Sequence, residues 1–172
     1  MDYFKRAEEL FSETKENRRY LHKNAETGFD LPKTTEFVCE KLKSYGINPI
    51  PCGKGITATI GNGKPTILLR ADMDALLIEE KTDLPFKSKI KGQMHACGHD
   101  MHAAILFGVL QDMVRERDFE GTLFGVFQPG EELNPGGASL VLGEEPFSGY
   151  NVAAVIGEHV DATLEVGEVG FC

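Results

Sequence analysis

The chain has 172 residues, of which 41% are apolar and 26% charged, the composition of an ordinary globular protein with room for one sizeable core. Its formal net charge of −9, with no lysine- or arginine-rich cluster, argues against a nucleic-acid-binding protein, because phosphate recognition needs a basic face. The sequence contains no apolar run of about 18 residues and no secretory signal, so we expect neither membrane insertion nor export, and a cytoplasmic location is the default.

The first quarter of the chain is predicted to be helical. Residues 2–25 carry apolar side chains at helical spacing on a charged background, which indicates an amphipathic helix. His22 near its end is expected to be solvated or to interact with the helix dipole, and a metal-ligand role is the weaker alternative. A second helix is expected over residues 32–45, with Pro32 in its first turn and Gly46 as its stop. Its core-facing residues would be Phe37, Val38, Leu42 and Tyr45.

Strand-like patterns begin after residue 55. Residues 56–60 and 66–70 are rich in β-branched and apolar side chains, and the Gly-Asn-Gly sequence at 61–63 predicts that they form a β-hairpin. Asp72 and Asp74 follow the second of these runs. Ligand sites in α/β sheets gather at the carboxyl ends of strands, although such aspartates also commonly cap turns or helices.

The densest chemical cluster of the chain lies at residues 94–102, after a polar segment (79–93) that we expect to be a surface loop. These nine residues hold three of the five histidines and one of the four cysteines. Thiolate and imidazole are ligands that Zn²⁺ accepts, so the cluster predicts a metal site, whereas each residue alone would be read as inert. The apolar run that follows predicts a buried helix beginning near Asp100, whose carboxylate suits a helix N-terminus. There His102 could be a further ligand or could orient a neighbour.

The remaining cysteines give no sign of a disulfide framework or of a structural zinc knuckle. They are widely spaced and form no Cys-x-x-Cys pair. Cys39, on the second predicted helix, is expected to be inert packing.

Two further core strands are predicted at residues 121–127 and 151–160, separated by a glycine-rich loop and short helix near 134–143. The first strand leads through a Pro-Gly turn to Glu131 and Glu132. Adjacent side chains at a strand end point in different directions, so one could bind a metal while the other reaches the water that the metal activates. A lone Glu-Glu pair would otherwise be surface charge. The second strand delivers His159 at its end, and we expect these strand ends to converge.

Four motifs together resemble the M20 metallopeptidase family, within its amidohydrolase branch of aminoacylases, hippurate hydrolases and auxin-conjugate hydrolases. The motifs are Arg-Ala-Asp-Met-Asp-Ala-Leu at 70–76, His-Ala-Cys-Gly-His-Asp-Met-His at 95–102, Gln-Pro-Gly-Glu-Glu at 128–132 and Gly-Glu-His-Val at 157–160. The departures are small: Leu77 stands where the branch usually has proline, and Gly130 where alanine is common. Alternating helices and strands, together with this resemblance, imply an α/β three-layer αβα sandwich like the catalytic domain of zinc peptidases.

The resemblance also implies the roles of individual residues. Cys97, His99, Glu132 and His159 match metal ligands, with Cys97 bridging two ions, and Glu131 matches the catalytic general base. One ion would be held by Cys97, His99 and His159. The other would need Cys97, Glu132 and a further histidine that this chain does not supply.

Residues 1–172 therefore resemble the incomplete, N-terminal portion of that catalytic domain, without the lid and dimerisation domain or the C-terminal part. The family binds two divalent ions (zinc, manganese, cobalt or nickel), and this chain would bind two, one or none. Family members are homodimers through the domain that is absent here. A small N-acyl amino acid or peptide-like conjugate is the expected partner, with no nucleic acid and no membrane.

The expected reaction is hydrolysis of the amide bond of an N-acyl amino acid by a metal-activated water, with Glu131 moving the proton. Asp72 or Asp100 would orient an imidazole from outside the ligand set. Two alternatives stay open. The chain could be a catalytically inactive metal-binding fragment of such an enzyme, or Cys97 could act as a nucleophile, which is the weaker explanation for so many donors together.

Overall fold

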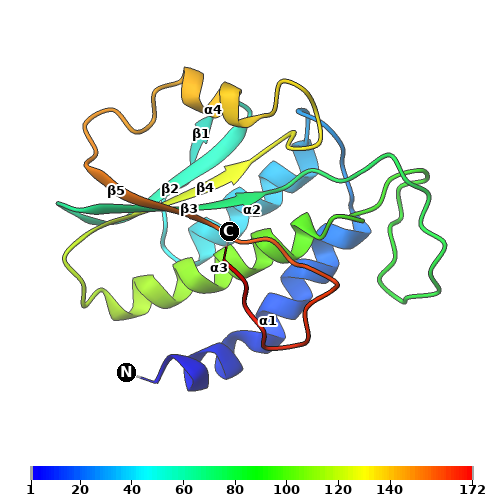
Figure 1. Cartoon of the computed structure of the whole chain (residues 1–172), viewed down its shortest axis with the longest axis horizontal. Coiled ribbons are helices and arrows are strands. Elements are labelled where there is room, and N and C mark those ends of the chain that lie inside the picture. The colour runs from blue at the N-terminus through cyan, green and yellow to red at the C-terminus, as the bar shows by residue number, and fades with distance from the viewer. Residues whose placement is uncertain (1, 172) are drawn as a thin grey trace.

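The structure, a computed structural model, describes residues 2–171 and arranges four helices and five strands along them (Figure 1). In chain order these elements are α1 (Tyr3–Lys23), α2 (Pro32–Ser44), β1 (Ile50–Cys52), β2 (Gly55–Asn62), β3 (Thr66–Asp72), α3 (His99–Glu116), β4 (Gly121–Gln128), α4 (Ala138–Gly143) and β5 (Val152–Gly157). The helices expected near the N-terminus and after the His/Cys cluster are confirmed. The three-residue strand β1 was not expected.

The strands form one mixed sheet in the order β1-β2-β4-β3-β5. β4, β3 and β5 are parallel to one another, while β2 runs antiparallel to both β1 and β4. Parallel strands need crossover connections, and α3 provides the one between β3 and β4.

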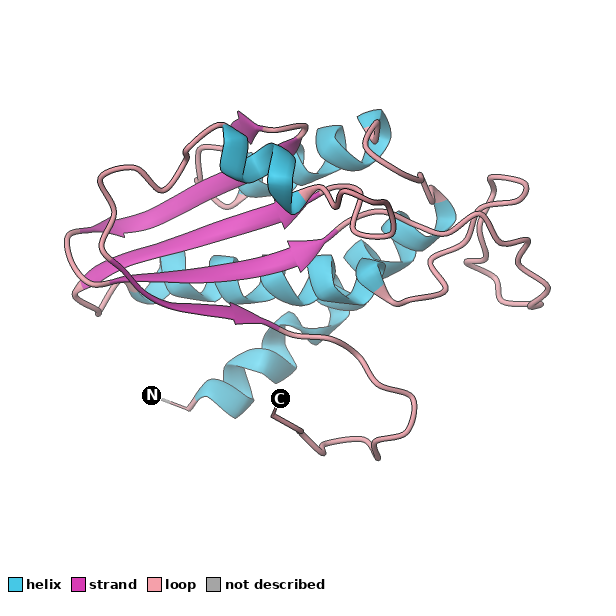
Figure 2. Cartoon of the chain, turned by 45° about the horizontal axis from the view of Figure 1, so that its top comes forward, coloured by secondary structure: helices cyan, strands magenta, loops and turns pink. Residues whose placement is uncertain are grey.

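Helices cover both faces of the sheet, so the predicted three-layer α/β arrangement is confirmed. α2 and α3 pack on one face, α4 lies on the other, and α1 packs against α3 on the side away from the sheet (Figure 2). Side chains of the strand β4 alternate between the two faces of the sheet, and both faces are buried beneath helices. Phe127 joins the cluster beneath α2 and α3, whereas Phe124 and Val126 pack toward Val141 of α4.

The predicted hairpin of residues 56–60 and 66–70 is wrong, because β4 lies between β2 and β3. The connection crosses the start of β4, where Thr122 N donates to Pro65 O (2.9 Å) and Thr122 Oγ1 donates to Gly63 O (3.0 Å). Gly-Asn-Gly suits a tight turn, but the apolar strand β3 gains more by pairing on both edges with parallel neighbours.

The strand expected within residues 151–160 is present, but it is an edge strand and not a core strand. β5 pairs with β3 on one side only, and Val155 and Ile156 are 65% and 53% exposed. Its apolar sequence resembles that of a core strand, yet within residues 2–171 these two side chains keep more than half of their surface exposed. The prediction of a buried strand, which was based on hydrophobicity alone, is therefore wrong for β5.

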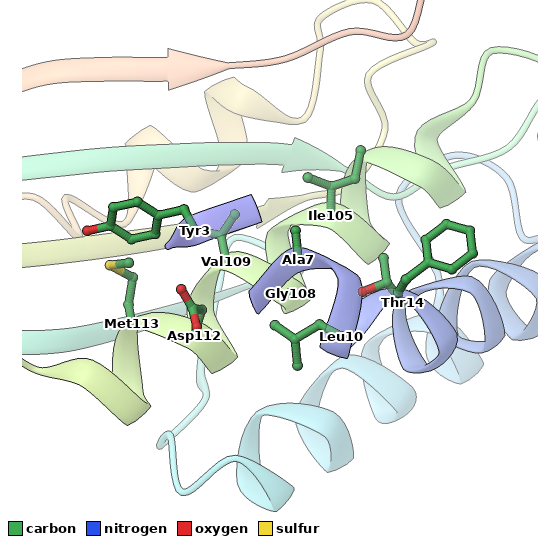
Figure 3. Close-up of a pocket in the computed structure, with 10 residues that line it drawn as sticks. Tyr3, Ala7, Leu10, Thr14, Ile105, Gly108, Val109, Asp112 and Met113 are labelled. Carbon is green, nitrogen blue, oxygen red and sulfur yellow. The ribbon is translucent and has the colours of Figure 1, made fainter. Parts of the chain in front are cut away.

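An apolar groove of about 410 Å³ lies between α1 and α3, where the two helices leave their outer side chains uncovered (Figure 3). Tyr3, Leu10, Ile105 and Val109 are among the residues that line it. No residue of the His/Cys cluster does so. No helix among residues 2–171 is both long enough and apolar enough to cross a membrane.

Candidate metal centre

The carboxyl ends of three parallel strands meet the N-terminus of α3 at one edge of the sheet. β3 ends at Asp72, β4 at Gln128 and β5 at Gly157, and α3 begins at His99. Because these strands are parallel, the loops that leave them start at the same edge (Figure 2). The convergence expected from the sequence is thus present in the fold.

Cys97, His99 and His159 form the first group of possible metal ligands. One atom from each lies within 4.8 Å of the other two, and Cys97 Sγ is 3.4 Å from His159 Nε2. Zinc bonds to sulfur at ~2.3 Å and to nitrogen at ~2.0 Å, which separates two ligands of a tetrahedral ion by about 3.5 Å. The spacing of these donor atoms therefore fits a shared cation.

His99, Glu131 and Glu132 form a second group around the same imidazole. His99 Nε2 lies 3.7 Å from Glu132 Oε1 and 3.9 Å from Glu131 Oε2, distances too long for hydrogen bonds. The His99 ring is almost fully buried, and neither of its nitrogens has a hydrogen-bond partner. Four carboxylates, those of Asp72, Asp74, Glu131 and Glu132, lie 3.5–3.9 Å from the nitrogens of this buried imidazole, and a cation among them would satisfy unpaired groups.

The environment of Cys97 favours metal binding over nucleophilic chemistry. Burial, together with the nearby Glu132, Glu131 and Asp72 carboxylates, raises the pKa of the Cys97 thiol to about 11. A cysteine nucleophile needs a lowered pKa and an electropositive setting, and neither is present. A divalent cation supplies the positive charge that makes a thiolate stable here.

His159 is oriented by its own backbone neighbour. Its Nδ1 lies 2.7 Å from Val160 O, so Nδ1 carries the proton and Nε2 faces Cys97 with a free lone pair. A carbonyl behind a ligating histidine fixes the tautomer in this way in many metal sites.

Asp72 forms its hydrogen bond to an imidazole, His102, that is outside the proposed ligand set. Its carboxylate accepts from His102 Nδ1 (2.6 Å) and from Arg70 Nη1 (2.7 Å), and it lies 3.7 Å from His99 Nε2. Burial opposes ionisation of Asp72, but the His102 hydrogen bond and the charges of His99 and Arg70 hold its pKa below the usual value.

His102 uses both ring nitrogens in this arrangement. Nδ1 binds Asp72 and Nε2 accepts from Val160 N (3.0 Å). Of the two roles considered for His102, the structure therefore favours orienting a neighbour: it holds the residue after His159, and it has no free lone pair for an ion.

Asp100 points away from the donor cluster. It is fully buried and contacts His22 Nδ1 and Arg18 Nε, each at 2.8 Å. Asp100 thus contacts an imidazole of α1 and none of the proposed ligand histidines, so the expected support of a ligand imidazole is not seen at Asp100. His22 is 2% exposed, so the expectation that it is solvated is wrong.

Asp74 was noted in the sequence beside Asp72 but was given no role at the site. Its two carboxylate oxygens accept from Glu131 N (2.9 Å) and Glu132 N (3.1 Å), and Oδ1 lies 3.5 Å from His99 Nδ1. Asp74 therefore ties the loop after β3 to the loop after β4. The available signal was the Asp-Met-Asp alternation, which puts two carboxylates just beyond one strand.

Parallel strand tips that surround a thiol, two imidazoles and two glutamates make this edge of the sheet a candidate metal centre. A family model described as Peptidase family M20/M25/M40 matches residues 68–172. The chain belongs to this family, and the family assignment made from the motifs is confirmed.

Curated relatives and a solved structure agree with this assignment. The chain is 40% identical over 159 residues to an N-acyl-L-amino acid amidohydrolase of Geobacillus stearothermophilus, covering 90% of this chain and 42% of the relative. It is 42% identical over 159 residues to an N-acetyl-L-cysteine deacetylase of Bacillus subtilis, covering 90% of this chain and 38% of the relative. The fold matches a dinuclear metal-binding M20 peptidase of Bacillus subtilis with a TM-score of 0.86 at 37% identity, covering 93% of this chain and 46% of that one. The chain thus spans about two fifths of the length of these proteins.

Proposed function

We propose that residues 1–172 form the N-terminal portion of the catalytic domain of a metal-dependent amidohydrolase that cleaves N-acyl amino acids. The observation that carries the proposal is the donor set of Cys97, His99 and His159 within 4.8 Å, next to the Glu131-Glu132 pair. The similarity to an N-acyl-L-amino acid amidohydrolase and an N-acetyl-L-cysteine deacetylase supports an N-acyl amino acid as the substrate.

The candidate donor atoms fall into overlapping groups that share His99. Cys97, His99 and His159 would hold one ion, and by the family resemblance Cys97 and Glu132 would contribute to a second. The second set is one ligand short of the first within this chain. The dinuclear Bacillus peptidase supports two ions in the complete protein, and sulfur, nitrogen and carboxylate donors suit zinc, cobalt, nickel or manganese.

When bound, such ions lower the pKa of a water molecule and polarise the amide carbonyl. Glu131 is the residue that moves the proton. Its side chain is 42% exposed and lies 3.9 Å from His99 Nε2, so it can reach both the donor cluster and solvent-borne substrate. Its carboxylate takes a proton from the attacking water and delivers it to the leaving nitrogen.

Asp74 keeps the two glutamates in their separate roles. Because its carboxylate binds both of their backbone N–H groups, a buried anchor holds the backbone from which the two glutamate side chains extend. Asp72 acts in the same way on His102 and thereby on the segment that carries His159.

Glu131→Gln tests the assignment of the proton carrier. With zinc, cobalt or manganese supplied, we expect the variant to keep its metal content and to hydrolyse N-acetyl amino acids at least about a hundredfold more slowly. Glu132→Gln should instead lose metal, and Glu144→Gln, an exposed acid on a distant helix end, should match the parent chain. Full activity in Glu131→Gln would falsify the proposed role.

A second candidate function follows from the length of the chain. Since it spans about two fifths of its relatives, an inactive metal-binding fragment is the alternative. Metal bound by elemental analysis, without hydrolysis of any N-acetyl amino acid by the parent chain, would favour this fragment over the enzyme.

A further inference from the structure

A second buried polar cluster lies behind the candidate metal centre, and we propose that His22 positions the segment carrying Cys97 and His99 by clamping it to α1. The cluster consists of His22 and Arg18 from α1, Glu80 from the loop after β3, and Asp100 from α3. The inference rests on the proposed function, since it assigns this cluster a role at that metal centre.

His22 joins the two acidic members of the cluster. Its Nδ1 lies 2.8 Å from Asp100 Oδ2, and its Nε2 lies 3.3 Å from Glu80 Oε2. The ring is 2% exposed, and the side chains of Asp100 and Glu80 are 0% and 3% exposed. Nδ1 hydrogen-bonds Asp100, and Nε2 faces Glu80 at ion-pair distance, so the ring bridges two segments that are far apart in sequence.

Glu80 is the anchor of the irregular loop that precedes the cysteine. It accepts from Ser88 N (2.6 Å) and from the Thr82 hydroxyl. The same loop is tied to the end of α1 by Lys89 N, which donates to Lys23 O (2.9 Å). Residues 79–93 have no helix or strand of their own, so these contacts with α1 set the path by which the chain reaches Cys97.

Asp100 connects His22 to the chain on the C-terminal side of Cys97. It follows His99 directly in the first turn of α3, and Arg18 holds its carboxylate in addition to His22. His95 lies two residues before Cys97, and the centroid of its ring is 6.3 Å from the centroid of the His22 ring. The segment from His95 to Asp100 therefore contacts His22 at both ends, while its central residues project toward the proposed ions.

The same pair of helices offers a matched control. At the opposite end of the α1 and α3 interface, Arg6 pairs with Asp112 and Glu116, away from every proposed ligand. Arg6→Gln removes a charged contact between α1 and α3, as His22→Gln does, but it leaves the loop of Glu80 and the first turn of α3 intact. A purely structural role for His22 predicts similar behaviour of the two variants.

The first measurement is amide hydrogen exchange in the metal-free protein. We expect His22→Gln to speed exchange at residues 95–102 at least about tenfold, with Arg6→Gln unchanged in that segment. Glu80→Gln, which alters the loop and leaves both helices untouched, should act in the same direction as His22→Gln. It also keeps the proposal testable if His22→Gln fails to fold.

The second measurement is zinc affinity by competition with a chelator, together with the absorption spectrum of the cobalt form. His22→Gln and Glu80→Gln should weaken zinc binding about tenfold or more and alter the cobalt spectrum, whereas Arg6→Gln should not. If His22→Gln and Glu80→Gln both match Arg6→Gln in amide exchange and in zinc affinity, the proposed clamp is wrong. A parent chain that binds no metal would refute the proposed function instead, and the exchange data would then decide the clamp alone.

Discussion

Gly98 is the residue on which the relative placement of Cys97 and His99 depends. It has φ +89°, in the left-handed region that favours glycine, and a Cβ atom there would lie 2.3 Å from Val160 Cγ2. Val160 follows the third proposed ligand, His159. A side chain at Gly98 would therefore disturb the backbone on two sides of the donor cluster.

Gly98→Ala should destabilise the protein by about 1–3 kcal/mol through the strained φ and by more through the overlap with Val160. Gly46→Ala is the control, since Gly46 has φ +76° and open space around its Cβ position. Urea unfolding of both variants separates the two effects. Equal losses would mean that the contact with Val160 carries no cost.

Zinc affinity should rise with pH because binding displaces protons. The pKa of the Cys97 thiol is about 11 in the metal-free protein. Burial opposes a charge on His99, but Asp74, Asp72 and Glu132 raise its pKa above the usual value. Both groups must lose a proton to bind an ion, so the affinity should increase about tenfold or more per pH unit between pH 6 and 8.

Calorimetry of zinc binding in buffers of different ionisation enthalpy measures the protons released. We expect at least about one proton per ion near pH 7 for the parent chain. Cys97→Ser should bind zinc more weakly and release fewer protons. An affinity that is independent of pH would contradict the assignment of Cys97 as a ligand.

At the scale of elements, Asp74 couples the ends of β3 and β4. Burial opposes its ionisation, but contacts with His99 and with the backbone amides of Glu131 and Glu132 hold the pKa of Asp74 below the usual value. A carboxylate whose folded pKa is depressed stabilises the protein above its unfolded pKa of about 3.9, and this stabilisation is lost as the pH falls through the folded value.

Asp74→Asn should therefore lower the free energy of unfolding by about 1–3 kcal/mol at pH 7, because one backbone donor loses its acceptor. The difference from the parent chain should narrow as the pH falls below about 4. Chemical unfolding across this range is the measurement. Asp161→Asn, which removes an exposed carboxylate that binds Thr163, is the control and should change little.

At the scale of the whole molecule, the two edges of the sheet differ. β1 is three residues long and contains Pro51, which lacks an N–H group, so this edge offers few pairing groups. β5 has six residues without a charge, and its outer edge is unpaired within residues 2–171. An apolar, uncharged edge strand is a template for association with another chain.

We expect the 172-residue chain to self-associate through β5 as its concentration rises. Val155→Lys should reduce the association, because a charge on an edge strand must lose water when a second strand pairs with it. Leu77→Lys, at a 79% exposed loop position, should have little effect. Sedimentation equilibrium checks both, and a parent chain that stays monomeric at every concentration would refute the prediction.

The local patterns of the sequence determined the helices, the apolar strands and the types of donor at the site. Helical spacing and stop residues are local properties, so α1, α2 and α3 could be predicted closely. The motifs around Cys97 and Glu131 also identified the family, because their combination is specific.

Only the tertiary structure decided which strands are neighbours and which polar groups share an environment. The insertion of β4 between β2 and β3 depends on the pairing of whole edges, which a turn signal such as Gly-Asn-Gly does not encode. The hydrogen bonds from Asp74 to the backbone of Glu131 and Glu132, and the one between Asp100 and His22, join residues that lie 57 or more positions apart along the chain. Hydrogen bonds over such separations form only after the sheet and helices have packed, and for that physical reason the support of the metal centre could not be read from the sequence.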